Sequence, residues 1–254
     1  MSFSFFGHRR MPQDEEWNLR TMFGPYLSFA ATEAYKLLRT NIVFSFPDDG
    51  KGKVVGITSA VQAEGKSTTS ANTAYALAEA GYHVLLLEAD LRKPTFAAKL
   101  GVEKSPGLSN LLVARGDYTE LIQHCDSAPK FDIISSGDIP PNPSELLGSD
   151  RMAEVIAELK EDYDYIVMDL PPVTVVSDAV AVSKALDGII MVVRAGVSDQ
   201  QMLEEAMRQL SMVNVRLIGF TYRDSDATVK RYGRNKYSKK YYKYYTEYVK
   251  HKQH

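Results

Sequence analysis

Hydrophobic positions in this chain form two kinds of segment, short continuous apolar runs and longer stretches with a helical period. The runs predict strands at residues 54–58, 83–88, 131–135, 165–169, 188–193 and 215–220. The longer stretches predict helices at residues 32–44, 67–80, 151–161, 178–185 and 200–213, with Thr32 as the first N-cap. Because nearly continuous apolar strands alternate with helices, we expect an α/β fold with a doubly wound, mostly parallel sheet.

The same pattern divides the chain into three parts. Residues 1–28 have little periodicity and are expected to form an N-terminal arm. Residues 29–223 contain the alternating strands and helices and are expected to form one domain. The apolar pattern stops in residues 224–254, so we expect this tail to be flexible, because it cannot bury enough surface to fold.

Composition narrows the class of protein. The chain has 254 residues, of which 44% are hydrophobic and 24% charged, as in ordinary soluble domains. Cys125 is the only cysteine, which excludes a disulfide framework and a multi-cysteine zinc site. Its apolar runs are too short to span a bilayer, and the N-terminus lacks the apolar region of a secretion signal. We therefore expect a cytoplasmic protein.

The net charge of −2 conceals an asymmetry between the body and the tail. Residues 230–254 contain nine Lys and Arg and a single acid, which gives +8, while the rest of the chain carries −10. Seven of the fifteen tyrosines also lie in this tail: Tyr232, Tyr237, Tyr241, Tyr242, Tyr244, Tyr245 and Tyr248. A basic, tyrosine-rich tail on an acidic body is the first indication of function.

A phosphate-binding motif follows the first predicted strand. Residues 60–67 read Ala-Val-Gln-Ala-Glu-Gly-Lys-Ser, a Walker A pattern in which Ala60 replaces the first glycine. Between a strand and a helix, such a loop directs its N–H groups at phosphate oxygens. We expect Lys66 to bind the β- and γ-phosphates and Ser67 to bind Mg²⁺. The expected nucleotide-binding residues in and after this loop are Ala60, Gln62, Ala63, Glu64, Gly65, Lys66, Ser67 and Thr68.

Acidic residues end two other predicted strands. Asp169 ends residues 165–169 in a Walker B pattern, and Glu88 and Asp90 follow residues 84–87. Glu88 and Asp90 are two positions apart, so on an extended strand both side chains would lie on one face. We expect Asp90 and Asp169 to bind Mg²⁺ together with Ser67. Glu88 or Asp90 is the predicted group that orients or deprotonates an incoming hydroxyl, and Lys66 and Asp169 complete the predicted catalytic set.

With these motifs, the sequence resembles the bacterial tyrosine kinases of capsule and exopolysaccharide systems over roughly residues 30–250. The resemblance rests on the Walker A loop, the acids at 88 and 90, Arg92-Lys93-Pro94, and Asp169-Leu170-Pro171-Pro172. It also rests on the segment at residues 140–147 and on the tyrosine-rich tail. It implies an ATP- and Mg²⁺-dependent kinase that phosphorylates the tail tyrosines of a neighbouring subunit, with Arg92 added to the nucleotide site.

The resemblance also implies partners. A form without membrane segments works with a separate membrane-spanning activator, which would hold it at the inner face of the membrane. A tyrosine phosphatase and a homo-oligomeric ring such as an octamer are further expectations. The family helix pattern used in ring assembly appears here as Glu33, Lys36 and Arg39. Lys36 replaces an arginine and lacks its bidentate fork, and Glu88 replaces the usual aspartate of the first acidic motif.

Other classes of function remain open at this point. A basic, aromatic tail is also typical of nucleic-acid binding or of contact with anionic lipid, although no nucleic acid is expected under the kinase interpretation. A partition-type ATPase switch would hydrolyse ATP without modifying tyrosine, and a scaffold would use nucleotide for assembly alone. The signature lysine of partition ATPases would stand at position 61, which is Val61 here. Base recognition cannot be assigned from Tyr222, Arg223 and Asp224.

Overall fold

The computed structural model describes residues 23–114, 116–125, 129–175 and 177–223. In this part of the chain seven strands form one sheet, in the order β3-β4-β2-β5-β1-β6-β7. All neighbouring strands are parallel except β3 and β4. The strands are β1 (Lys53–Ser59), β2 (Val84–Glu88), β3 (Gln123–His124), β4 (Asp132–Ile134), β5 (Tyr165–Asp169), β6 (Gly188–Arg194) and β7 (Leu217–Arg223). The predicted doubly wound, mostly parallel sheet is therefore confirmed.

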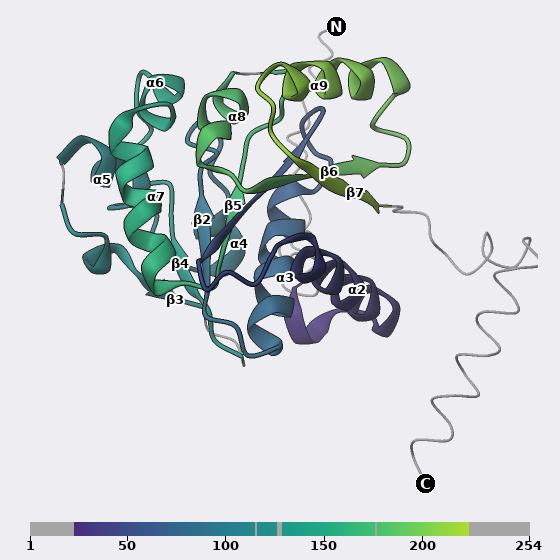
Figure 1. Ribbon diagram of the computed structural model, residues 1–254, viewed down its shortest axis with the longest axis horizontal. Coiled ribbons are helices and arrows are strands. Elements are labelled where there is room, and N and C mark those ends of the chain that lie inside the picture. Colours follow the sequence, from purple (N-terminus) through teal and green to yellow (C-terminus); the bar gives the residue numbers. More distant parts are fainter. Residues whose placement is uncertain (1–22, 115, 126–128, 176, 224–254) are drawn as a thin grey trace, which may run out of the picture.

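Helices cover both faces of the sheet (Figure 1). On one face lie α2 (Phe29–Ser45), α3 (Lys66–Glu79) and the short α4 (Phe96–Leu100), which share a core with β1 and β2. The other face is covered by α5 (Leu108–Ala114), α6 (Pro143–Leu147), α7 (Asp150–Asp162), α8 (Asp178–Ala181) and α9 (Gln200–Met212). Turns of 3₁₀ helix occur at Gly24–Tyr26, Tyr118–Leu121 and Val182–Ala185. No helix of the described ranges is long and apolar enough to cross a membrane.

The first long helix begins earlier than the sequence pattern predicts. Ser28, not Thr32, is the N-cap of α2, because the Ser28 Oγ accepts a hydrogen bond from the Ala31 N–H at 3.3 Å. Thr32 lies one turn inside the helix, where its own hydroxyl donates to the Ser28 carbonyl. The prediction of Thr32 as N-cap was wrong because Phe29, the first residue of α2, is 57% exposed and gives no signal of a buried face.

The strand order places the three predicted motifs side by side. β5 lies between β1 and β2, and Asp169 is paired in register with Ile57 of β1 and with Glu88 of β2. Parallel strands end at the same edge, so the loop after β1 and the acids after β2 and β5 meet there. This edge is called the phosphate edge below.

The last residues of the predicted arm that the structure describes pack against the body. The Phe23 ring makes edge contacts with Tyr75 and Phe131, and the Gly24 N–H donates to Asn72 Oδ1 at 2.9 Å. The domain boundaries at residues 28 and 223 stay predictions. Residues 1–22 of the arm and the whole predicted tail, 224–254, lie outside the described residues.

Candidate active site

The loop between β1 and α3 has the backbone shape of a phosphate-binding loop. Gly65 is the N-cap of α3 with φ +93°, and Ala63 also has a positive φ of 63°. Only glycine adopts the Gly65 conformation without strain, which explains its place just before Lys66. The first N–H groups of α3 lack helical partners and carry the positive end of the helix dipole, so this loop can bind an anion.

A buried carboxylate holds this loop from within. Glu64 is fully buried, and its Oε2 accepts a hydrogen bond from the Val61 N–H at 2.8 Å. The Ser198 hydroxyl donates to its Oε1, and the Arg194 Nη1 donates to the Ala63 carbonyl at 2.8 Å. Glu64 was predicted to bind nucleotide as part of the loop. Its side chain fixes the loop to the turn after β6, and a contact of Glu64 with nucleotide stays a prediction.

Lys66 and two acids form the charged centre of the phosphate edge. The Lys66 Nζ lies 3.8 Å from Asp90 Oδ2, and Asp169 Oδ1 accepts from the Ser70 hydroxyl at 2.9 Å. Burial raises the pKa values of Asp90 and Asp169, although the Lys66 ammonium opposes both shifts. The structure thus brings Lys66, Asp90 and Asp169 together as the sequence predicted.

The oxygen atoms at this centre fit a magnesium ion. Asp169 Oδ2 is buried and has no hydrogen-bond partner among the described residues. The Ser67 hydroxyl lies close enough to Asp169 to lower the pKa of its carboxyl. No cluster of three or more His, Cys, Asp or Glu that could hold a metal occurs in the described ranges. A site with few acids suits Mg²⁺, which takes one or two carboxylates and completes its shell with phosphate and water.

Glu88 has a different environment from Asp90. Its Oε1 accepts hydrogen bonds from the N–H groups of Thr95 and Phe96, and its Oε2 accepts from the Ser136 N–H at 3.1 Å. The side chain is 1% exposed, and burial raises its pKa despite these three donors. The expected shared face with Asp90 is not seen, because β2 ends at Glu88 and Asp90 lies beyond the strand. Glu88 connects β2 to α4 and to the segment after β4.

Arg92 lies at the same edge but has a partner of its own. Its Nε and Nη2 donate to the two oxygens of the buried Asp178 at 2.8 and 3.0 Å. The Arg92 Nη2 also donates to the Ser144 hydroxyl at 3.3 Å, and the Ser144 hydroxyl donates to Asp178. The segment at residues 140–147 therefore reaches the site through Ser144. A contact between Arg92 and nucleotide stays a prediction.

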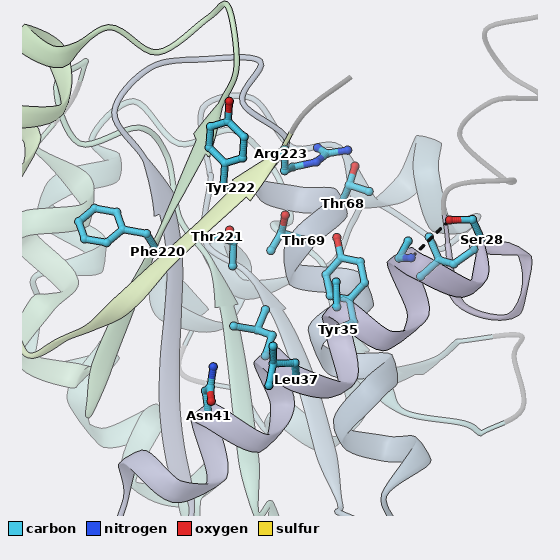
Figure 2. Close-up of a pocket in the computed structure, with 14 residues that line it drawn as sticks. Ser28, Tyr35, Leu37, Asn41, Thr68, Thr69, Phe220, Thr221, Tyr222 and Arg223 are labelled. Carbon is cyan, nitrogen blue, oxygen red and sulfur yellow. Dashed lines mark hydrogen bonds between the residues drawn. The ribbon is translucent and has the colours of Figure 1, made fainter. Parts of the chain in front are cut away.

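Two hollows lie at the start of α3. One cavity of about 390 Å³ is lined by Gln62, Lys66, Ser67, Asp90, Arg92 and Lys99, and is called the phosphate cavity below. A groove of about 680 Å³ lies between α2 and β7 and reaches Thr68 and Thr69 (Figure 2). Arg223 lines this groove, and a Cβ added to Gly65 would lie 1.4 Å from its Nη1. The guanidinium therefore lies directly against the phosphate loop.

The residues predicted for ring assembly pair within this chain. Lys36 Nζ lies 3.2 Å from Glu33 Oε1 on α2, and Arg39 Nη1 donates to the Ala76 carbonyl at 3.0 Å. Arg39 also lies 3.6 Å from Glu79. A role of these three residues between subunits stays a prediction. All seven predicted phosphoacceptor tyrosines lie outside the described residues.

Four polar residues near the site were not singled out from the sequence. Two of them could have been found from their positions. Ser70 lies one helical turn after Lys66 in α3, and Asp178 is the first residue of α8. Ser198 and Lys99 follow no motif, and only the fold brings them to the phosphate edge.

Comparison with known proteins decides the family. A model described as an AAA domain matches residues 52–217. The tyrosine-protein kinase YwqD of Bacillus subtilis is 38% identical over 188 residues, which are 74% of this chain and 78% of YwqD. The chain belongs to the bacterial tyrosine-protein kinases. CpsD of Streptococcus agalactiae, another kinase of this family, is 34% identical over 79% of this chain and 85% of its own.

A solved structure of a tyrosine kinase agrees with this assignment. The kinase domain of the Escherichia coli tyrosine kinase ETK has a TM-score of 0.73 at 31% identity and covers 78% of both chains. The chimeric protein CapA2B2 also has a TM-score of 0.73 at 30% identity, over 82% of this chain and 89% of its own. The septum-site protein MinD from Pyrococcus horikoshii, solved with Mg-ADP, has a TM-score of 0.56 at 24% identity, over 66% of this chain and 69% of its own. That likeness shows a common fold.

Proposed function

We propose that this tyrosine-protein kinase transfers the γ-phosphate of Mg·ATP to tyrosines in the C-terminal tail of a neighbouring copy of the same chain. The observation that carries the proposal is the meeting of Lys66, Asp90 and Asp169 beside the phosphate loop. A polyphosphate needs a cation and loop amides, and its metal needs acidic oxygens, so this arrangement supplies what phosphoryl transfer requires. The acceptors are Tyr232, Tyr237, Tyr241, Tyr242, Tyr244, Tyr245 and Tyr248.

The chain's own residues would act mainly by position and charge. The loop amides and Lys66 bind the phosphates and stabilise the negative charge that develops during transfer. Asp169, Asp90 and Ser67 would hold Mg²⁺, which supplies further positive charge at the transferred group. Asp90 is also the acid best placed to orient a tyrosine hydroxyl, because Glu88 already accepts three backbone hydrogen bonds. A tail substrate needs no folded pocket of its own.

The test combines two variants. Lys66→Met protein incubated alone with Mg·ATP should form no phosphotyrosine, because its phosphate loop lacks the ammonium. A second variant keeps Lys66 but has all seven tail tyrosines changed to Phe. When the two are mixed, phosphotyrosine should appear on the Lys66→Met chain, which shows transfer between subunits. Persistent phosphotyrosine on purified Lys66→Met protein alone would contradict the assignment of Lys66.

We further propose a role in capsular or exopolysaccharide synthesis at the inner face of the membrane. The chain covers only 28% of EpsB, a putative tyrosine-protein kinase of Ralstonia nicotianae, at 35% identity, so some relatives carry much additional sequence. The proposed partners are a separate membrane-spanning activator and a tyrosine phosphatase that would reverse the modification. The activator is tested by comparing the anti-phosphotyrosine signal of the kinase in the presence and in the absence of a candidate activator. An activator that leaves the signal unchanged would argue against it.

A partition-type ATPase switch is the alternative that the fold allows. It predicts ATP hydrolysis with no phosphate on the tail. Mass spectrometry of the tail after incubation with Mg·ATP separates the two functions, since only the kinase leaves phosphate on tyrosine. Binding of DNA that weakens with added salt would instead favour a nucleic-acid role for the tail.

A further inference from the structure

Lys99 is a cation of the phosphate cavity for which the described residues supply no hydrogen-bond or ion-pair partner. It lies on α4, outside the phosphate loop, and is half-buried. Lys66 lies beside Asp90, Arg92 pairs with Asp178 and Lys93 donates to Gln62. Within the described ranges, the Lys99 ammonium forms neither a hydrogen bond nor an ion pair shorter than 4 Å.

The surroundings of Lys99 disfavour its charge in the absence of an anion. Burial lowers the pKa of Lys99, and the positive charges of Lys66 and Arg223 act in the same direction. Asp169 and Glu88 attract the ammonium, but they only partly oppose this shift. A desolvated cation next to another cation is unfavourable unless an anion joins them. A polyphosphate in this cavity is such an anion.

The fold holds Lys99 in this position. Glu88 accepts the N–H groups of Thr95 and Phe96, which fixes the start of α4. Phe96 is fully buried, and Lys99 follows three residues later on the same face of the helix. Both residues line a small hollow together with Ser67 and Thr68 at the start of α3. The Lys99 side chain therefore lies against the part of α3 whose N–H groups face the phosphates.

We propose that Lys99 is a second phosphate-binding lysine, contributed by α4, that binds the polyphosphate of the nucleotide. This inference rests on the proposed nucleotide site. It gives Glu88 a function without contact to substrate, because Glu88 positions the helix that carries Lys99. It also explains why a cation without a partner among the described residues is kept at a half-buried position, where it costs stability in the empty protein.

The test measures binding of ATP, ADP and AMP to the full chain by calorimetry in the presence of Mg²⁺. Lys99→Met should weaken ATP binding by about 10- to 100-fold, as expected for the loss of a charge-assisted hydrogen bond. It should weaken ADP binding less and AMP binding least, because the lost contact is with the outer phosphates. Lys99→Arg should retain most of the affinity. Lys51→Met, which removes an exposed lysine before β1, is the matched control and should leave all three affinities unchanged.

A second measurement separates phosphate binding from packing. Without nucleotide, Lys99→Met should melt at the same temperature as the wild type or higher, because the variant removes an unpaired cation. Equal losses for ATP, ADP and AMP, or a lower melting temperature, would assign Lys99 a packing role and overturn the inference. Unchanged ATP affinity would also overturn it, while the proposed function would stand. A wild-type protein that binds no ATP would overturn both the inference about Lys99 and the proposed function.

Discussion

At the scale of residues, the buried acids of the phosphate edge are suited to binding a metal ion. Without a metal ion, their negative charge destabilises the fold. Asp169 is 1% exposed, and one of its oxygens has no partner among the described residues. Burial raises its pKa, because the charged carboxylate costs more free energy in the folded protein than in the unfolded chain, and the Lys66 ammonium only partly offsets this cost. The carboxyl therefore stabilises the fold at low pH, and this contribution is lost as the pH rises through its folded pKa.

Asp169→Asn should stabilise the protein that holds neither metal nor nucleotide. The amide oxygen can still accept from Ser70, while the desolvated charge is removed. A relief of about 1 kcal/mol would raise the melting temperature by about 2–4 °C at pH 7.5. The difference from wild type should shrink as the pH is lowered, because the wild-type carboxyl then becomes protonated. Melting curves from pH 5 to 8 without Mg²⁺ check this.

The same variant should lose the dependence of ATP binding on Mg²⁺. A lower melting temperature at pH 7.5 would show instead that the charge of Asp169 is well compensated in the empty protein. Asp199→Asn is a suitable control for the change of charge, since Asp199 is an exposed N-cap of α9 whose oxygen still accepts from Met202 after substitution.

At the scale of elements, the strands were easier to predict than the connections between them. Each predicted strand overlaps an observed one, because a buried parallel strand needs a run of apolar residues and that requirement appears in the sequence. β3 was missed, since its two residues, Gln123 and His124, carry no apolar signal. No helix was predicted between residues 80 and 151, yet α6 begins at Pro143, a residue that is favoured in the first turn of a helix.

In the candidate site, too, residues next to strands were easier to predict than residues on the connections. Lys66, Ser67 and Asp169 were predictable because a short motif fixes their place relative to one strand end. The different directions of Glu88 and Asp90 were not predictable, because the alternation of a strand applies only as far as the strand continues. Lys99 reaches the cavity through α4, a helix of five residues that no periodicity can reveal.

Glu88→Ala should destabilise the fold by about 3 kcal/mol. The substitution leaves the N–H groups of Thr95, Phe96 and Ser136 buried without their acceptor, and each such loss is costly. Chemical denaturation with urea measures the effect. Glu120→Ala, at an exposed position, is the control and should change stability by less than about 0.5 kcal/mol. An effect on ATP binding alone, with full stability, would indicate that Glu88 contacts the ligand directly.

At the scale of the whole molecule, the charge of the tail relative to the body offers a switch. Residues 230–254 of the tail carry +8, against −10 for the rest of the chain. Each phosphotyrosine adds about −1.5 to −2 at neutral pH, so full modification takes residues 230–254 to roughly −3 to −6. A basic tail is attracted to acidic surfaces of neighbouring subunits, while an anionic tail is repelled by them.

Phosphorylation should therefore loosen self-association of the kinase. Light scattering before and after incubation with Mg·ATP should show a fall in mass, and added salt should reduce the difference because it screens the charges. The variant with seven tail tyrosines changed to Phe is the control and should keep its mass. An unchanged mass after full phosphorylation would show that self-association does not depend on the charge of the tail.

The end of β7 bears on which tail a given site modifies. Arg223 closes that strand and its guanidinium lies against Gly65, so the last described residue lies beside the phosphate loop of its own chain. Tyr232 follows nine positions later, and an extended chain spans at most about 3.6 Å per residue. A tether of about 30 Å is ample for a return to the point of departure. Distance therefore does not protect a kinase molecule from modifying itself, and any preference for a neighbour must come from geometry imposed by assembly.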